Sequence, residues 1–78
     1  MTALEQLAKL LREYTGDGSL RVERGSVIAT DLGLDSYDFA SLLGDVEERF
    51  GVEISDRAVM ELLTVGDVAD YIETHRHA

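Results

Sequence analysis

Apolar residues recur at helical spacing along this chain, and this periodicity constrains the fold more than any other feature. In the first stretch they fall at i, i+3, i+4 and i+7, which places them on one face of a helix. These residues are Leu4, Leu7, Ala8 and Leu11, with Leu10 and Tyr14 widening the stripe. Thr2 and Glu5 match the capping box that opens a helix. Gly16 and Gly18 predict its end near residues 14–15.

A second helix is predicted over roughly residues 36–50, where apolar residues again recur every three or four positions. Its expected inward residues are Phe39, Leu42, Leu43, Val46 and Phe50. Asp35 is a suitable N-cap, because its carboxylate can accept hydrogen bonds from backbone N–H groups that lack a partner. Asp38 complements the positive end of the helix dipole. Gly51 suits the position just after the last turn.

Two further helices are predicted in the last third of the chain. Ser55 or Asp56 can cap a short one. Its expected apolar residues are Val59, Leu62 and Leu63. Residues 64–67 resemble another capping arrangement, which would open a last helix. The inward residues of that helix are Val65, Val68, Ala69 and Ile72. The pattern then ends, so we expect fraying over residues 73–78.

A glycine-punctuated connection over residues 16–35 joins the first two helices, and we expect Val27, Ile28 and Leu32 to pin it to the core. Proline is absent and β-branched alternation is scarce. The fold class predicted is therefore all-α: a small antiparallel four-helix bundle with a long loop between helices one and two. We expect residues 1–78 to form a single domain.

Acidic residues are concentrated in the middle of the chain. The formal net charge is −9, and residues 31–56 hold eight carboxylates against Arg49 alone. Direct nucleic-acid binding is disfavoured, because it requires a basic patch. A partner protein with a basic surface would instead be attracted to this acidic segment. The alternative is that these acidic residues form only a solvated face that promotes solubility.

Other features exclude several classes of protein. Cysteine is absent, which rules out disulfides, thiolate metal sites and a cysteine nucleophile. No apolar run is long enough to span a membrane, and no secretory signal is predicted. No catalytic base is near Ser36, because His75 and His77 fall in the expected frayed tail. We predict no catalytic residues and no metal site, although a His-x-His pair can bind metal.

Ser36 is the candidate functional residue. Gly33 permits a sharp turn before the cap, and Ser36 then falls in the first turn of the second helix. Backbone N–H groups at such a position favour a phosphate. The sequence therefore predicts a serine that is presented to solvent rather than packed.

Three segments carry a family resemblance. Residues 31–38 (DLGLDSYD) resemble the D-L-G-x-D-S-[LY]-D signature of acyl carrier proteins. Residues 50–54 (FGVEI) resemble their F-x-x-E-I segment, and residues 64–72 (TVGDVADYI) resemble their final T-V-x-D-[VA]-x-x-Y-[IV] helix. Together with the first helix and the long loop, the resemblance covers nearly the whole chain.

The resemblance implies that a phosphopantetheinyl transferase attaches 4′-phosphopantetheine from coenzyme A to Ser36, which is flanked by Asp35, Tyr37 and Asp38. The thiol of that arm would carry acyl groups as thioesters, and the chain itself would be non-catalytic. Acyltransferases and ketosynthases would dock through basic patches. The matching residues here are Asp35, Asp38, Asp45, Glu47 and Glu48, with Tyr37 and Ala40 as apolar contacts.

The pathway is less defined than the carrier role. Many fatty-acid carriers have a glutamate and a methionine where Ser41 and Gly44 stand. Fatty-acid, polyketide and related biosynthesis therefore all stay open, with a cytoplasmic monomer expected. The alternatives are an unmodified acidic docking module and a carrier of an aminoacyl or peptidyl group. A further hypothesis from the resemblance is that the core opens between the second and third helices and shelters an acyl chain.

Overall fold

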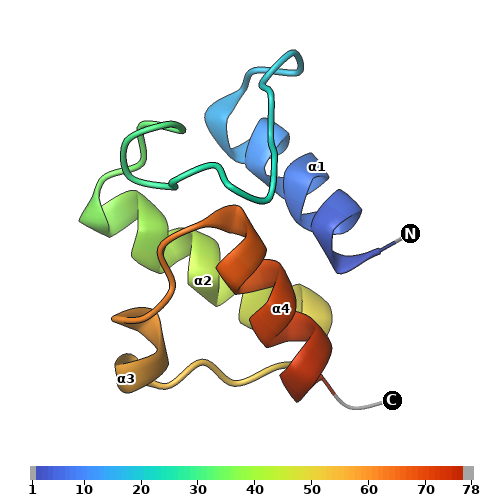
Figure 1. The fold of residues 1–78 in the computed structure, drawn as a ribbon, viewed down its shortest axis with the longest axis vertical. Helices are drawn as coiled ribbons and strands as arrows, with labels where there is room; N and C mark the ends of the chain where they lie inside the picture. Colours follow the sequence, from blue (N-terminus) through green and yellow to red (C-terminus); the bar gives the residue numbers. More distant parts are fainter. Residues whose placement is uncertain (1, 77–78) are drawn as a thin grey trace.

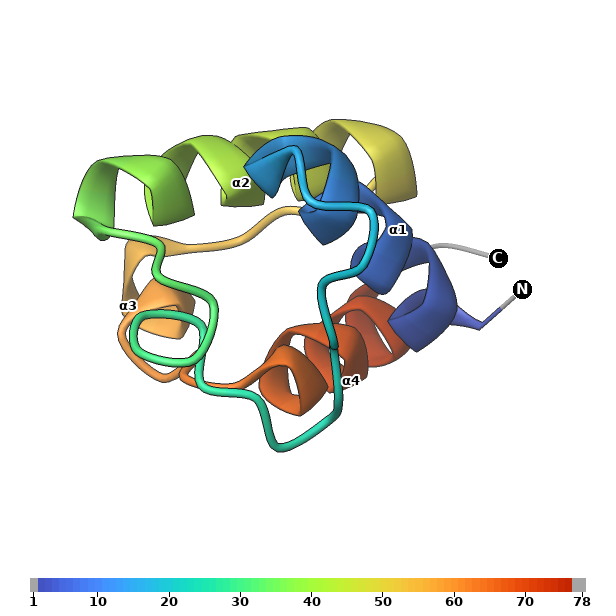
Figure 2. The ribbon, with the colours of Figure 1, turned by 90° about the horizontal axis from the view of Figure 1, so that it is seen from above.

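Capped helices and one long loop make up the fold. The computed structural model describes residues 2–76, in which four helices follow one another: α1 (Ala3–Thr15), α2 (Ser36–Phe50), α3 (Asp56–Val59) and α4 (Val65–His75) (Figure 1). Seen from above, α2 and α4 lie on opposite sides, with α1 and the short α3 between them (Figure 2). The predicted all-α four-helix fold is confirmed.

The predicted helix ends follow from local capping. The Thr2 hydroxyl accepts the Glu5 N–H at 3.1 Å, and Asp35 Oδ1 accepts the Asp38 N–H at 2.8 Å. Gly16 and Gly51 end α1 and α2 in the left-handed conformation, with φ of 74° and 66°. A residue with a Cβ would be strained there, so glycine stops each helix.

The long loop is fixed mainly to the start of α4. The Ile28 N–H donates to the Leu63 carbonyl at 3.1 Å, and the Val65 N–H donates to the Ser26 carbonyl at 2.9 Å. Ile28 and Leu32 are buried as expected, whereas Val27 is half-buried and forms an isolated β-bridge with Thr64. The loop is thus held by backbone pairing as well as by apolar anchors. The Leu34 side chain is also buried, which the helical pattern did not predict.

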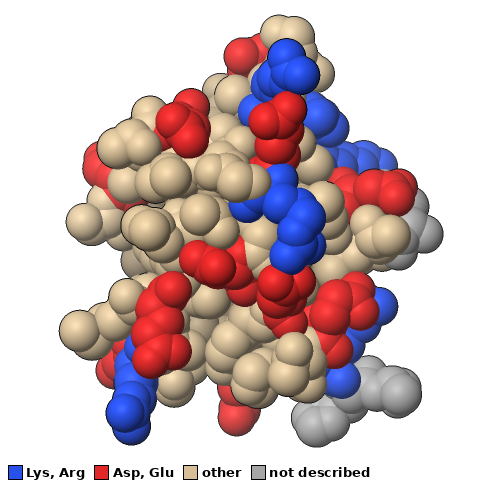
Figure 3. Space-filling view, in the orientation of Figure 1, with Lys and Arg blue, Asp and Glu red and all other residues tan. Residues whose placement is uncertain are grey.

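Charged side chains lie on the outside. The ion pairs found among residues 2–76 join Arg21 to Glu23, Arg24 to Asp70, Arg49 to Glu13 and Arg76 to Glu73. On the face drawn in Figure 3, Lys and Arg are interspersed with Asp and Glu rather than gathered into a basic area. No described helix is long and apolar enough to cross a lipid bilayer.

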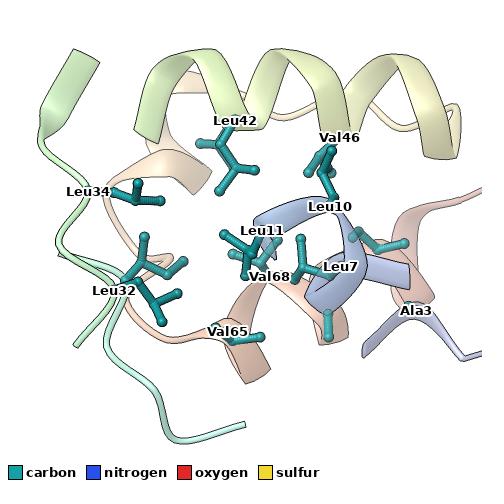
Figure 4. Packing of buried hydrophobic residues seen from close by; sticks show 14 of the residues in the cluster. Ala3, Leu7, Leu10, Leu11, Leu32, Leu34, Leu42, Val46, Val65 and Val68 are labelled. Carbon is teal, nitrogen blue, oxygen red and sulfur yellow. The ribbon is translucent and has the colours of Figure 1, made fainter. Parts of the chain in front are cut away.

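The core is formed by the inward faces of α1, α2 and α4 (Figure 4). α1 packs mainly on α4 and less extensively on α2. The largest fully buried side chains are Leu7, Leu11, Leu42, Val46, Val65, Val68 and Ile72. Phe39 and Phe50, expected to point inward, are half-buried and pack against this cluster from its edge.

Two expectations about the last third are wrong. α3 ends at Val59, so Leu62 and Leu63 lie in the segment beyond it rather than within the helix. None of its four residues is buried, so packing against the core does little to stabilise a longer helix. The fraying expected from Glu73 onward is also wrong over residues 73–75, because α4 continues through His75, and residues 77–78 lie outside the described part of the chain.

Side-chain contacts hold the last turn of α4. The His75 ring stacks on Tyr71 with centroids 3.9 Å apart, and its Nδ1 lies 3.0 Å from the Tyr71 carbonyl oxygen. Glu73 accepts the Ala3 N–H at 3.3 Å, which links this turn to α1. His77, the other half of the considered metal pair, lies outside the described residues.

A full capping box opens α4. Asp67 accepts the N–H groups of Thr64 and Leu63, each at 3.0 Å, while the Thr64 hydroxyl accepts the Asp67 N–H at 3.1 Å. The hydrogen bonds from Thr64 and then Leu63 hold the pKa of Asp67 below its ordinary value. The ionised carboxylate therefore stabilises the folded state.

We expect Asp67→Asn to lower the free energy of unfolding by about 0.5 to 1 kcal/mol near neutral pH, the lower half of the usual range for a helix cap. The wild-type advantage is present above the unfolded Asp pKa of about 3.9 and is lost as pH falls through the lowered folded pKa. Urea unfolding at several pH values measures it. Glu53→Gln, at an exposed acid, serves as the control. A gap between Asp67→Asn and wild type that stays constant into acid would contradict the assignment.

Candidate functional site

Ser36 is the first residue of α2 and is exposed to solvent. Its hydroxyl makes no hydrogen bond within residues 2–76. The Asp35 carboxylate accepts a hydrogen bond from the Asp38 N–H, and the Asp35 carbonyl accepts one from the Phe39 N–H at 2.9 Å. The N–H groups of Ser36 and Tyr37 lie in the first turn of α2, at the positive end of the helix dipole, where no partner within the helix is available. The structure thus presents a hydroxyl beside two backbone donors.

The turn before α2 fixes this position. Gly33 has a φ of 68°, and the leucines on either side of it, Leu32 and Leu34, are both buried. The Leu34 N–H donates to the Ile28 carbonyl at 3.4 Å. Because both neighbours of the turn are anchored, the following Asp35 and Ser36 are placed at the surface.

A small pocket opens beside Ser36. Its volume is about 120 Å³. The lining is formed by Ile28, Ala29, Leu34, Asp35, Ser36, Phe39, Leu62 and Leu63. These residues come from the long loop, the first turn of α2 and the segment after α3. The pocket is therefore apolar except where Asp35 and Ser36 form one side.

Comparison with known proteins supports a single family. Residues 5–72 match the family described as "Phosphopantetheine attachment site". The chain belongs to the acyl carrier protein family. It is 41% identical over 69 residues to the "Acyl carrier protein" of Sinorhizobium fredii (strain NBRC 101917 / NGR234), covering 88% of each chain. "Acyl carrier protein AcpP" of Rhizobium meliloti (strain 1021) gives the same identity and coverage. The cofactor of this carrier is 4′-phosphopantetheine.

The exposed serine of this carrier suits such a group. A phosphate ester on its hydroxyl would lie next to the free N–H groups of Ser36 and Tyr37, where a helix start favours negative charge. Asp35 and Asp38 add repulsion nearby, which disfavours a phosphate held only by non-covalent contacts. The geometry therefore fits a covalently attached group better than a free one. Among residues 2–76, no cluster of three or more His, Asp or Glu side chains is suited to hold a metal ion.

The acids expected to meet partners of the carrier occupy different environments. Glu48 is exposed, whereas Asp45 is half-buried. Glu47 is also half-buried, and its Oε2 accepts the Ile54 N–H at 2.9 Å. Glu47 therefore fixes the linker after α2, a role that the resemblance did not suggest. Glu47 and Ile54 are seven residues apart and lie on either side of the end of α2, so no local sequence pattern predicted this contact.

Exposed apolar residues gather around the serine of the carrier. Ala40 is exposed one turn further along α2, and Tyr37 is 79% exposed directly after Ser36. Leu63 lines the pocket and is 60% exposed, and Met60 is 87% exposed. The sequence pattern placed Leu63 among the apolar residues of the short third helix and gave no prediction for Met60. The exposure of Leu63 places apolar surface at the pocket.

Proposed function

We propose that the chain is a non-catalytic carrier, with 4′-phosphopantetheine attached to Ser36 and acyl groups held on its thiol as thioesters. The observation that carries the proposal is the exposed Ser36 hydroxyl, free of hydrogen bonds within the described residues, at the start of α2. Membership of the family supplies the cofactor. No protein thiol competes with the arm, because the chain has no cysteine.

The modification is a phosphoryl transfer. The Ser36 oxygen forms a bond to the β-phosphorus of coenzyme A, and the bond from that phosphorus to the bridging oxygen breaks. Adenosine 3′,5′-bisphosphate leaves, and the serine proton passes to a base on the transferase. Ser36 needs only to be reachable and correctly oriented, and the Asp35 cap and the buried Leu34 hold it in place. When bound, the arm supplies the thiol chemistry.

The experiment that tests the proposal is intact-mass analysis after incubation with coenzyme A and a broad-specificity phosphopantetheinyl transferase. We expect one phosphopantetheine adduct per chain, and peptide fragmentation should place it on Ser36. A chain that stays unmodified under conditions that modify a known carrier would overturn the proposal and favour an unmodified acidic docking module.

Partner enzymes are proposed to dock on the acidic surface of α2 and its preceding turn. Asp35, Asp38, Asp45, Glu47 and Glu48 lie on this helix or at its cap, with Tyr37 and Ala40 exposed between them. The transferase, acyltransferases and ketosynthases would meet it through basic patches. Charge attraction of this kind speeds encounter and is screened over about 8 Å at physiological ionic strength. Such contacts suit a carrier that visits several enzymes.

Glu48→Lys is expected to slow phosphopantetheine transfer at low salt by about threefold to tenfold, because rim charges act mainly on association rates. Glu48 is chosen over Glu47, whose carboxylate also holds Ile54. The kinetics of transfer across a salt series measure the effect, with circular dichroism to verify folding. The matched control is Glu53→Lys, which makes the same charge change in the linker after α2. Equal rates for both variants would argue against docking on α2.

For the pathway, we propose a class of biosynthesis rather than a single route. We assign the carrier to fatty-acid, polyketide or related biosynthesis in the cytoplasm, where coenzyme A is available. The names of the two relatives support an acyl cargo. Ser41 and Gly44 make the middle of α2 less acidic and less apolar than in many fatty-acid carriers. This difference supports a partner set that differs from theirs.

A further inference from the structure

Asp31 is an exposed acid five residues before Ser36, and its carboxylate is hydrogen-bonded within the chain. Its Oδ2 accepts the Val27 N–H at 2.8 Å, and its own N–H donates to the Val27 carbonyl at 2.8 Å. The two hydrogen bonds close a turn over residues 27–31, seen as the tight bend of the long loop in Figure 2. We infer that Asp31 is a positioning residue for the modification of Ser36. This inference rests on the proposed function, because it concerns the transfer of phosphopantetheine to that serine.

The turn is attached to the rest of the fold at its first residues. Val27 forms an isolated β-bridge with Thr64. The Ile28 N–H donates to the Leu63 carbonyl at 3.1 Å, and the Ile28 side chain is buried. The start of the turn therefore has a fixed place beside the start of α4. Asp31 joins the end of the turn to that fixed place.

The segment between Asp31 and Ser36 has little freedom. Leu32 and Leu34 are buried, and Gly33 between them has a φ of 68°. Hydrophobic burial is non-directional, so the two leucines fix the depth of the segment rather than its direction. The direction is set by the hydrogen bonds that hold the backbone.

These hydrogen bonds are unequal. The Leu34 N–H donates to the Ile28 carbonyl at 3.4 Å, longer than the usual limit of about 3.2 Å. Both bonds of Asp31 are 2.8 Å long, and an ionised acceptor strengthens one of them. Loss of the Asp31 carboxylate would leave the turn with its backbone bond alone. The direction in which the chain enters α2 would then be less well defined.

The competing explanation is that Asp31 attracts a basic partner, like the acids of α2. The two roles make different demands on the side chain. Docking needs the negative charge, whereas positioning needs an oxygen that accepts the Val27 N–H. Asparagine keeps such an oxygen and loses the charge, and alanine loses both. Asp31→Asn and Asp31→Ala therefore separate the two roles.

The test is single-turnover phosphopantetheine transfer from coenzyme A to the intact chain, with increasing concentrations of a broad-specificity transferase in excess. The maximum rate reports the step after docking, and the half-saturating concentration reports docking. We expect Asp31→Ala to lower the maximum rate about tenfold, less than the roughly hundredfold loss that a displacement of about 1 Å can cause. The half-saturating concentration should change by less than about twofold. Asp31→Asn should keep more than about half of the wild-type maximum rate, because its oxygen still accepts the bond.

Asp17 provides a matched control within the same loop. Its carboxylate accepts the Ser19 N–H at 3.0 Å and the Ser19 hydroxyl at 2.7 Å, and like Asp31 it is exposed. Asp17→Ala therefore removes one charge and comparable bonds outside the turn. It should leave the maximum rate unchanged. Equal losses in Asp17→Ala and Asp31→Ala would show that any loosening of the loop slows transfer, and would overturn the inference.

A pair of glycine variants tests the same path without changing any charge, and decides the question if Asp31→Ala folds poorly. Gly33 and Gly16 both have a positive φ, and a Cβ on either would meet nothing within 4 Å. Alanine therefore brings the same backbone strain to both positions. We expect Gly33→Ala to lower the maximum rate, whereas Gly16→Ala should lower only the stability measured by urea unfolding. Gly33→Asn should restore most of the rate, because asparagine adopts a positive φ more readily than alanine.

Several results would overturn the inference and leave the proposed function standing. A raised half-saturating concentration in both Asp31→Asn and Asp31→Ala, with an unchanged maximum rate, would make Asp31 a docking acid. Equal maximum rates for Gly33→Ala and Gly16→Ala would show that the path from the turn does not position the serine. Failure of the proposed function is seen separately, as a wild-type chain that gains no phosphopantetheine adduct.

Discussion

Ser36→Ala is expected to abolish phosphopantetheine addition completely while leaving the fold intact. The reaction needs the hydroxyl oxygen as nucleophile, and alanine supplies none. The folded state loses little, because the Ser36 side chain is exposed and makes no hydrogen bond in the described part of the chain. We expect the free energy of unfolding to change by less than about 0.5 kcal/mol. Intact mass and urea unfolding measure the two quantities on the same sample.

Ser41→Ala is the matched control for this prediction. Ser41 also lies on α2, but it is in the interior of the helix and half-buried. We expect normal modification of this variant at the wild-type rate. An adduct of equal mass on Ser36→Ala would place the attachment elsewhere and would remove the basis for the carrier assignment.

The helix ends could be predicted because their causes are local in sequence. Thr2, Asp35 and Thr64 each accept an N–H three residues ahead, and Gly16 and Gly51 stop their helices through their own backbone conformation. Such contacts need no knowledge of the tertiary fold. Ser36 was placed correctly at the exposed start of α2 for the same reason.

The contacts that shape the pocket were not predictable from the pattern. Ala29 and Leu63 line one cavity although they are far apart in sequence. The burial of Leu34 likewise depends on the loop turning back over the core. One missed feature did have a signal: Tyr71 and His75 are four residues apart on α4, the spacing at which helix side chains meet. That pair accounts for the ordered last turn.

At Gly66 the backbone of α4 lies close to the backbone of the loop. Its N–H donates to the Arg24 carbonyl at 2.8 Å, and a Cβ placed on it would lie 2.9 Å from that same oxygen. Arg24 is held a second time, because its guanidinium bonds to Asp70 on α4 at 2.7 Å. The loop therefore cannot move away from Gly66 without losing other contacts.

We expect Gly66→Ala to lower the free energy of unfolding by about 2 kcal/mol, the middle of the usual range for overpacking. In a chain of this size, that is a fall in Tm of roughly 10 °C. The clash is with a backbone oxygen rather than with the end of a flexible side chain, so relief requires a shift of the whole segment. Thermal unfolding followed by circular dichroism measures the change.

Gly44→Ala should change stability in the opposite direction. Gly44 is exposed on α2, has no positive φ, and a Cβ there would meet nothing within 4 Å. Alanine in a helix interior is favoured over glycine by about 0.5 to 1 kcal/mol, so this variant should be stabilised. Comparison of the two variants thus separates two effects on stability. Gly44→Ala reports helix propensity alone, whereas Gly66→Ala also reports the close contact with the loop. If both variants were stabilised, the close approach at Gly66 would not be what holds the loop, and the pocket walls contributed by Ile28 and Ala29 would need another support.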